Sequence, residues 1–385
     1  MEVIYRGFDG LDVSFSTQIP REFSEELEAA KEHAQKSRQP TPLCWNGVKM
    51  LVAESGAPGG YAFRVSTGEF GATWFFKKPG ARDPWGVRVS CSSFCLALKG
   101  LGGSRSELYR TMALLGIAVA AGNESIGRVD YAIDFLAPEF VMIPERFVMH
   151  SSSNRTEHYE PPEVQCSGRS GRVTSVTVGK MPRRQVIVYD KRSEVIAHRK
   201  QGWWQIWNAA LAERGDPSLN EELAAESRVW RVELRAGKEH LKERWNIVKW
   251  ADLDERLGDL ISAMLDAVRY TRPTADSNRS RWPDDQLWQH VRRETEADLF
   301  EMTSRADPAL VKRVQKETHE RLLATQMLGL LTTRAALCGV VFSDLSAFAG
   351  VVGSEMAREI ARAPDRFERK LAAAGGRYDL GLREP

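Results

Sequence analysis

The sequence is short of cysteine, of long apolar runs and of net charge, and each shortage excludes a class of protein. Its five cysteines are odd in number and scattered: Cys44, Cys91, Cys95, Cys166 and Cys338. This spacing excludes a disulfide framework and a cysteine zinc site, and it fits a reducing cytoplasm. The longest apolar stretches, 114–121 and 335–352, are too short or too interrupted to span a bilayer. Since the opening MEVIYRGFDG also lacks a secretory signal pattern, we expect a cytoplasmic protein with no membrane partner.

Three motifs of common site types are also missing. No Gly-x-x-x-x-Gly-Lys-Ser/Thr segment occurs, which excludes a nucleotide-binding P-loop. No Gly-x-Ser-x-Gly segment occurs, which excludes the nucleophile turn of α/β-hydrolases. The seven histidines form no His-x-His pair, so a two-histidine metal motif is not indicated.

The net charge is only +2 at pH 7, but the cations are unevenly distributed. Between Ser167 and Lys200 the chain carries nine Lys or Arg against two acidic residues. A local basic patch favours binding of a polyanion, whatever the total charge of the protein. A solvated basic surface is the alternative interpretation of this run.

Three short segments alternate between apolar and polar residues, which is typical of β-strands with one buried face. They are RVDYAIDF at 128–135, QVIVYDK at 185–191 and WRVELR at 230–235. Because residues i, i+2 and i+4 of a strand point to one face, each segment presents its polar side chains together. The three sets are Arg128, Asp130 and Asp134; Gln185, Tyr189 and Lys191; and Arg231, Glu233 and Arg235. If the strands share a sheet, this face combines the groups that metal-assisted attack on a phosphodiester requires.

The carboxylates of this set are candidate metal ligands. Asp130 and Asp134 lie on one face of their strand, close enough to chelate one cation, and Glu233 on a neighbouring strand can complete the site. Oxygen ligands of this kind favour Mg²⁺ or Mn²⁺. The alternative is that these acids face solvent and pair with the arginines of the same strands.

Tyr189 is the candidate nucleophile. It points to the polar side of its strand with Lys191, rather than to the side of Val186 and Val188. A phenol has a pKa of about 10 and must lose its proton before it attacks phosphorus. A nearby lysine or metal ion favours the phenolate. The alternative is structural, because strands are rich in tyrosine.

The order of expected elements predicts an α+β protein, with a mainly antiparallel β-sheet, flanking helices and a helical C-terminal region. We expect strands at 11–15, 48–52, 61–66, 73–77, 86–91, 174–178 and 184–189. We expect helices at 20–35, 104–121, 203–213, 220–226, 251–270, 285–303, 309–329, 332–338 and 354–373. The polar stretch 273–283 is typical of a linker. The predicted domains are therefore 1–271 and 272–385.

Taken together, the three polar strands resemble those of the Rep_trans family of rolling-circle replication initiators and related relaxases. The family pattern is Arg-hydrophobic-Asp-x-x-x-Asp-Phe, then Tyr-Asp/Asn-Lys ending in Glu, then Trp-Arg-Val-Glu. Here it stands as RVDYAIDF at 128–135, VYDKRSE at 188–194 and WRVEL at 230–234. FDGLDVSF at 8–15 and WGVRVSCSSFCLALKG at 85–100 are also similar, so the resemblance covers roughly residues 8–271.

The resemblance implies a DNA-nicking domain over 1–271 and assigns roles by position. Tyr189 matches the family's nucleophile, and Lys191 matches a lysine that touches the scissile phosphate. Asp130 and Glu233 match the carboxylates of the metal site, with Asp134 a weaker third. The implied cofactor is Mg²⁺ or Mn²⁺. The expected DNA contacts are basic side chains on or near these strands: Arg128, Arg169, Arg172, Lys180, Arg183, Arg184, Arg192 and Arg231.

The implied activity is a transesterification that nicks and rejoins one DNA strand at a replication origin through a 5′-phosphotyrosine link. Such a nick starts rolling-circle replication of a plasmid, phage or integrative element. The implied partners are origin DNA, double- and single-stranded, with a host helicase and polymerase, and a homodimer is left open. A relaxase that nicks a transfer origin for conjugation needs the same chemistry and is an alternative. A non-catalytic DNA-binding protein of a mobile element is another.

Overall fold

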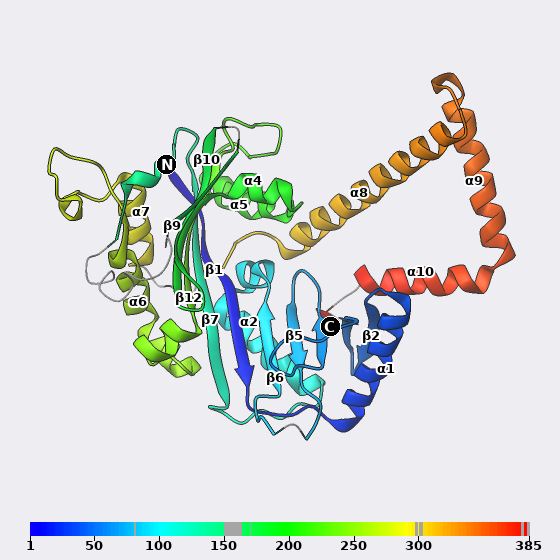
Figure 1. Ribbon diagram of the computed structural model, residues 1–385, viewed down its shortest axis with the longest axis horizontal. Coiled ribbons are helices and arrows are strands. Elements are labelled where there is room, and N and C mark those ends of the chain that lie inside the picture. The colour runs from blue at the N-terminus through cyan, green and yellow to red at the C-terminus, as the bar shows by residue number, and fades with distance from the viewer. Residues whose placement is uncertain are drawn as a thin grey trace.

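The computed structural model describes residues 1–80, 82–149, 164–169, 171–296, 299, 303–378 and 381–382. A twelve-stranded sheet runs through it, and the pairings between its named strands are antiparallel. The strands lie in the order β14–β3–β4–β5–β6–β1–β7–β12–β11–β10–β9, with β2 beside β3. Helices flank the sheet and a helical segment follows it (Figure 1). The predicted α+β architecture is confirmed.

The elements have the following bounds. The strands are β1 Glu2–Phe15, β2 Thr41–Trp45, β3 Val48–Val52, β4 Phe63–Ser66, β5 Ala72–Phe76, β6 Val87–Cys91, β7 Glu124–Leu136, β8 Phe147–Met149, β9 Val164–Arg169, β10 Arg172–Lys180, β11 Arg184–Asp190, β12 Val229–Gly237, β13 Val268–Tyr270 and β14 Gly381–Leu382. The helices are α1 Arg21–Ser37, α2 Ser93–Leu114, α4 Lys191–Ala197, α5 Gly202–Ala212, α6 Trp250–Ala267, α7 Gln286–Thr295, α8 Pro308–Leu337, α9 Leu345–Arg362 and α10 Pro364–Tyr378. Short 3₁₀ turns cover Pro144–Arg146, Arg279–Arg281 and Phe342–Asp344, and a π-helical turn covers His240–Arg244.

Strands β1 and β7 are long and form the middle of the sheet. β7 pairs with β1 along its whole length, whereas β6 pairs with β1 only from Leu11 onward. The predicted strand at 11–15 was therefore too short. The first half of β1 contains Gly7 and Gly10 and two shifts of register, which weaken the alternating pattern on which the prediction depended.

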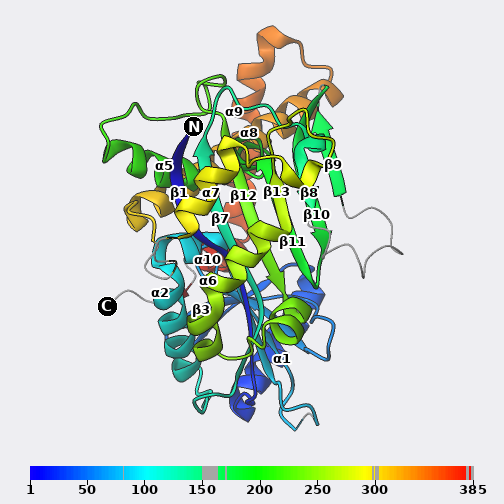
Figure 2. The same cartoon turned by 90° about the vertical axis from the view of Figure 1, so that its left-hand side faces the viewer.

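One face of the central strands is apolar and closes the main core. Val232 and Leu234 of β12 are almost fully buried there, with the matching residues of β7 and β11. Helices α6 and α7 cover this face (Figure 2). Burying each such side chain stabilises the fold by about 1.5–3 kcal/mol. Because successive residues of a strand point to opposite sides, the polar residues between them are directed to the other face.

Helix α7 packs in the same core as the sheet, although it lies beyond residue 271. Its Leu287, Trp288 and Val291 are fully buried in the main core. A β-bridge between Thr271 and Asp284 joins the two ends of the segment that precedes α7. The packing therefore keeps α7 with the sheet, and the domain boundary at 271 stays a prediction.

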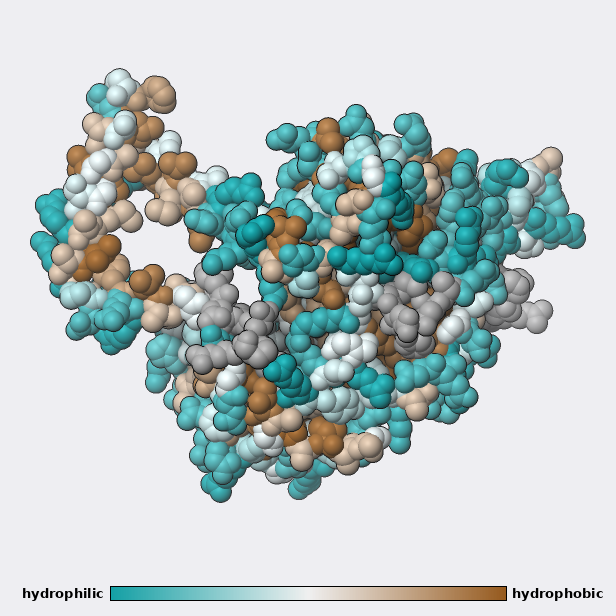
Figure 3. All heavy atoms as spheres, turned by 180° about the vertical axis from the view of Figure 1, so that it is seen from behind, coloured by the Kyte–Doolittle hydropathy of each residue, from teal (hydrophilic) through white to brown (hydrophobic). Residues whose placement is uncertain are grey.

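Helices α8, α9 and α10 form the C-terminal arm, residues 308–378. α8 extends away from the sheet, α9 follows, and α10 returns to β2 and β3 (Figure 1). Large apolar side chains are exposed along the arm, including Leu337 at 84% and Phe342 at 91%. They show as brown areas on the arm (Figure 3). Exposed apolar patches of this kind mark interaction surfaces in native proteins.

Several of the expected helices differ from the structure. The segment 220–226 forms turns, in which Asn220 Oδ1 accepts from the backbone N–H of Glu222. The segments 309–329 and 332–338 form the single helix α8. The helix expected at 104–121 is capped by Ser92 and ends at Leu114, with a kink at Gly100 where φ is 65°. None of the described helices is long and apolar enough to cross a membrane.

His240 is a half-buried base whose protonation opposes folding. Burial, together with the charges of Arg184 and Arg244, lowers the pKa of His240 to about 4. The unfolded chain takes up this proton near pH 6.5, so folding loses stability as the pH falls from about 6.5 to about 4. Over this window we expect the wild-type free energy of unfolding to fall by about 1–2 kcal/mol more than that of His240→Gln. Urea unfolding at pH 7 and pH 4.5 measures the difference, and equal losses in the two proteins would contradict it.

Candidate active site

The registers of four neighbouring strands bring the predicted polar residues onto one face, here called the polar face. Three rows cross it: Tyr189–Arg231–Asp134–Tyr5, then Ile187–Glu233–Ala132–Gly7, then Gln185–Arg235–Asp130–Gly10. In each row the residues belong in turn to β11, β12, β7 and β1. The predicted sharing of one face by these strands is confirmed.

The rows also set the spacing between the candidate nucleophile and the candidate metal ligands. Neighbouring strands lie about 4.8 Å apart, and successive residues rise by about 3.3 Å. Glu233 is one strand and two residues from Tyr189, so their backbones are separated by about 5 Å across the sheet and about 7 Å along it. Asp130 is two strands and four residues away, about 10 Å across and about 13 Å along. Tyr189 therefore adjoins Glu233, and Asp130 lies beyond it.

Asp130 and Glu233 form a buried carboxylate pair, each about 1% exposed. Arg128 Nε donates to Asp130 Oδ1 at 2.9 Å. Arg235 Nε lies 2.7 Å from Glu233 Oε1 and 3.9 Å from Asp130 Oδ2, so it bridges the two acids. Burial raises the pKa of Asp130 to about 7, with the Glu233 carboxylate acting in the same direction and both arginines opposing it. Two acids held this close are an arrangement that an added cation stabilises.

The pair fits a divalent cation in two further respects. Glu233 Oε2 is buried and accepts no hydrogen bond from the described part of the chain. Gly10 faces Asp130 so closely that a Cβ at residue 10 would overlap the Asp130 carboxylate. The described residues contain no group of three or more His, Cys, Asp or Glu arranged to hold a metal. A site built on two carboxylates would complete its shell with water and substrate oxygens, as Mg²⁺ sites commonly do.

Asp134, the expected third ligand, is engaged elsewhere. Arg231 donates to it from Nε at 2.5 Å and from Nη2 at 2.8 Å, and Trp207 Nε1 donates at 2.8 Å. Arg231 also pairs with Asp9 through Nη1. Arg231 and Asp134 are both fully buried, so Asp134 fixes the arginine rather than joining the Asp130–Glu233 pair. Arg231, an expected DNA contact, is likewise shielded from solvent in this structure.

Tyr189 is partly exposed and lies between two cationic groups. Its backbone pairs with that of Arg231, and Lys191 Nζ lies 5.7 Å from the centre of its ring. Burial of the phenol raises the pKa of Tyr189, and the charge of Arg231 opposes the increase. Lys191 pairs with Glu194 at 2.7 Å, and burial lowers the pKa of Lys191, with Arg231 next in effect.

Lys191 reaches the tyrosine from a helix rather than from the strand. The strand ends at Asp190, whose Oδ1 accepts from the backbone N–H of Ser193 and caps α4. Lys191 is the first residue of that helix. The expectation that it continues the strand was therefore wrong by one residue, although its ammonium group still lies beside the Tyr189 ring.

Comparisons with known proteins add only a distant likeness. No family model matches the chain, and no curated protein matches its sequence. The chain is similar in structure to a rolling circle replication initiator protein from Geobacillus stearothermophilus. That likeness has a TM-score of 0.38 at 15% identity and covers 76% of this chain and 96% of the other. It is too distant to carry an argument, so membership of the Rep_trans family stays a prediction.

The expected DNA contacts fall into three groups. Arg128 covers the Asp130 carboxylate and is 34% exposed, and Lys180 is exposed at the end of β10. Three others hold the protein itself: Arg172 pairs with Asp190, Arg183 with Glu239, and Arg192 donates to Ser227 Oγ and the carbonyl of Glu221. Arg184 is half-buried at the start of β11, and the side chain of Arg169 lies outside the described residues.

Asp9 and Glu194 complete the charge network around Tyr189 and were not predicted. Asp9 lies where the register of β1 shifts between Phe8 and Gly10, so the alternating pattern does not assign its side to a face. Arg231 and Lys191 lower the pKa of Asp9 against the opposing effect of its burial. Glu194 pairs with Lys191 from the next turn of α4. If a helix had been expected after Asp190, the i, i+3 spacing of Lys191 and Glu194 would have predicted this pair.

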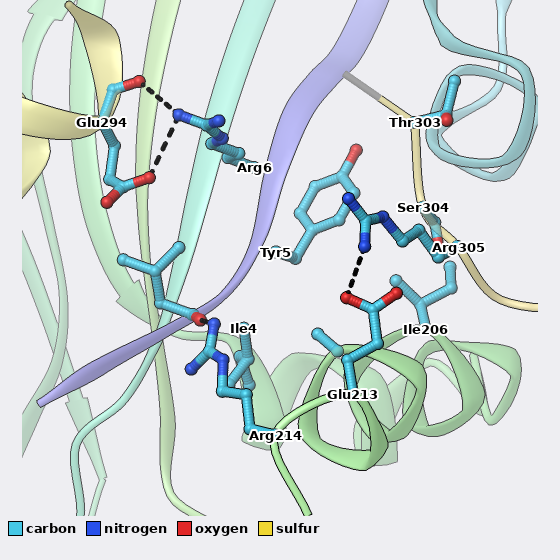
Figure 4. A pocket seen from close by; sticks show the side chains of 12 residues that line it. Ile4, Tyr5, Arg6, Ile206, Glu213, Arg214, Glu294, Thr303, Ser304 and Arg305 are labelled. Carbon is cyan, nitrogen blue, oxygen red and sulfur yellow. Dashed lines mark hydrogen bonds and ion pairs between the residues drawn. The ribbon is translucent and has the colours of Figure 1, made fainter. Parts of the chain in front are cut away.

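A cavity of about 540 Å³ lies beside the first half of β1, next to the polar face (Figure 4). Tyr5 belongs to both, and α5 and residues 303–305 form the other walls. Its charged groups are paired across it, Arg6 with Glu294 and Arg305 with Glu213. Arg214 also lines the cavity and donates to the backbone carbonyl of Val3, so the lining carries one more cation than acids.

The Arg231 network gives a stability prediction. Arg231→Met is expected to lower the free energy of unfolding by about 3–5 kcal/mol, because it leaves two carboxylates, one of them fully buried, without their cation. Arg228→Met is the matched control, since the Arg228 guanidinium donates to the backbone carbonyl of Pro138. Urea unfolding at pH 7 measures both variants. Similar losses in the two would indicate that the buried pairs contribute no more than an ordinary surface arginine.

Proposed function

We propose that the protein nicks and rejoins one strand of DNA with Tyr189 as the nucleophile. The observation that carries the proposal is the polar face itself, on which a partly exposed tyrosine adjoins two cations and a buried carboxylate pair. A structural sheet surface does not need two buried acids that share one arginine. The same set provides a nucleophile, charge for an oxyanion and oxygen ligands for a divalent cation.

In the proposed reaction, Tyr189 Oη forms a bond to the scissile phosphorus while the bond from phosphorus to the 3′ oxygen breaks. The phenol releases its proton to water, and the departing 3′ oxygen takes up a proton. The products are a 5′-phosphotyrosyl strand and a free 3′-hydroxyl, and the reverse reaction rejoins the DNA. Nothing is oxidised or reduced, and the phosphotyrosyl bond retains the energy needed for rejoining, so no ATP is required.

The cationic side chains around Tyr189 favour its reactive form. The buried guanidinium of Arg231 lies in the next strand and stabilises a phenolate by its charge. Asp134, Asp9 and Trp207 hold that side of the network in place. Lys191, with its pKa lowered by burial, is within reach of a phosphate placed at the ring.

Asp130 and Glu233 would hold Mg²⁺ or Mn²⁺, which would supply positive charge to the phosphate oxygens. Arg128 and Arg235 now neutralise these acids and are 34% and 29% exposed. If a cation took their place, the two guanidinium groups would be free to turn toward the DNA backbone. Arg128 would then act as the DNA contact expected from the sequence.

The biological setting we propose is initiation of rolling-circle replication of a plasmid, phage or integrative element. Origin DNA is the substrate, and the free 3′-hydroxyl would serve a host polymerase behind a host helicase. A conjugative relaxase needs the same nick and stays the alternative. The exposed apolar side chains of the C-terminal arm support the further expectation of a homodimer.

The test is a search for the covalent intermediate. The protein is incubated with Mg²⁺ or Mn²⁺ and labelled DNA from the replicon that encodes it, then separated on a denaturing gel. A labelled band at the mass of protein plus DNA supports the proposal, and sequencing the attached end locates the nick. If no band forms with either cation, and none forms on single-stranded versions of the same DNA, the proposal fails.

A further inference from the structure

Small hydrogen-bonding side chains continue the polar face from Tyr189 to the edge of the sheet. The row of Tyr189 passes through Ser175 of β10 to Ser167 of β9. The next row passes through Thr177 of β10 to Gln165 of β9. The side chains of Ser167 and Gln165 are exposed, and those of Ser175 and Thr177 are half-buried. We call these four residues the edge platform.

The strands that carry the edge platform are rich in cations and free of acids up to Tyr189. From Val164 to Tyr189 the sequence has five Lys or Arg and no Asp or Glu. Of these cations, Lys180 and Arg183 lie near the turn between β10 and β11, and Arg172 lies at the other end of β10. Arg183 and Arg172 also pair with Glu239 and Asp190, but their side chains are 63% and 38% exposed. A neutral hydrogen-bonding surface between cationic ends is complementary to a polyanion rather than to a cation or an acidic peptide.

We propose that the edge platform holds the single DNA strand next to the scissile phosphate. Ser175, Thr177 and Gln165 donate hydrogen bonds to its phosphate and sugar oxygens. This inference rests on the proposed function, because Tyr189 marks where the scissile phosphate lies. Hydroxyl and amide donors of this kind position a nucleic-acid backbone without reading its bases.

The dimensions suit a short length of DNA. Tyr189 is two strands from β9, a distance of about 10 Å. At about 3.4 Å per stacked nucleotide, this corresponds to three nucleotides. A strand attached to Tyr189 would therefore run along these rows before it leaves the sheet at β9.

The test uses two side chains of β10 on the platform and a third on the same strand whose hydroxyl donates within the protein. The double variant Ser175→Ala with Thr177→Val removes two hydroxyl groups that face the DNA. Thr174→Val is the matched control, because Thr174 lies at the shift of register beside Ser175 and its hydroxyl donates to the backbone carbonyl of Ser167. Binding of a labelled single-stranded oligonucleotide is measured by fluorescence anisotropy in EDTA, so that no cleavage occurs.

The double variant is expected to bind the oligonucleotide about 5- to 30-fold more weakly than wild type, the effect of two lost hydrogen bonds. The dependence of binding on salt should not change, because no charge is removed. Gln165→Ala, on the exposed edge strand, is expected to weaken binding about threefold without affecting folding. An unchanged affinity in the double variant, or an equal loss in Thr174→Val, would overturn the inference.

These results are independent of the nicking chemistry. A protein that binds DNA through the platform but forms no adduct in Mg²⁺ or Mn²⁺ would refute the proposed function and leave the platform standing. If the adduct forms, the double variant is expected to need about 5- to 30-fold more DNA than wild type for half-maximal adduct formation. A large fall in the single-turnover rate with unchanged affinity would count against a backbone-binding role.

Discussion

Tyr189→Phe is expected to abolish covalent attachment to DNA, lowering the adduct yield at least about a thousandfold. The variant keeps the ring over which Lys191 lies and removes only the oxygen that would attack phosphorus. Because the side chain is partly exposed, the fold should be unaffected. The measurement is the denaturing-gel assay with Mn²⁺, together with oligonucleotide binding in EDTA, which should match wild type.

Tyr5→Phe is the matched control for this experiment. Tyr5 lies in the same row of the polar face, two strands beyond Arg231, and it is buried with its hydroxyl donating to the carbonyl of Phe8. Its loss should leave the adduct intact. An adduct that persists in Tyr189→Phe but is lost in Tyr5→Phe would move the nucleophile to the other end of the row.

The polar faces of β7, β11 and β12 could be predicted because alternation is local. Period-two polarity over six to eight residues assigned Asp130, Glu233 and Tyr189 to the sides on which they lie. The order of the strands is not local. It is the position of β12 between β7 and β11 that makes Glu233 adjoin both Asp130 and Tyr189, and no pattern within one strand contains that information.

Side-chain partners were the other part that could not be predicted. Asp130 and Asp134 lie on the same face of β7, but their partners differ. Arg231 and Trp207 bind Asp134, whereas Arg128 and Arg235 bind Asp130. The difference arises because α5 covers the row of Asp134 with Trp207. Asp9 was hidden by a shift of register, and Lys191 was misplaced by the cap of α4. In each case a tertiary contact or a local irregularity overrides the simple period.

Glu233→Gln is expected to remove most of the divalent-cation binding and to lower the single-turnover nicking rate by about a hundred- to a thousandfold. Gln keeps the shape and one oxygen of Glu233 but removes the negative charge that pairs with Asp130 in holding a cation. The Oε2 atom, which accepts no hydrogen bond from the described residues, is the one that a cation would use. Isothermal titration with Mn²⁺ measures the loss without any DNA, so the metal role is tested apart from activity.

Glu239→Gln separates a specific metal role from a general loss of negative charge. Glu239 follows β12 and pairs with Arg183 at 3.5 Å, with 42% of its side chain exposed. The control removes the same charge from an exposed pair, so Mn²⁺ binding and nicking should match wild type. If Glu233→Gln binds Mn²⁺ as tightly as Glu239→Gln, the carboxylate pair serves only to hold Arg128 and Arg235. The cation would then have to be sought elsewhere, or the tyrosine would act with arginine alone.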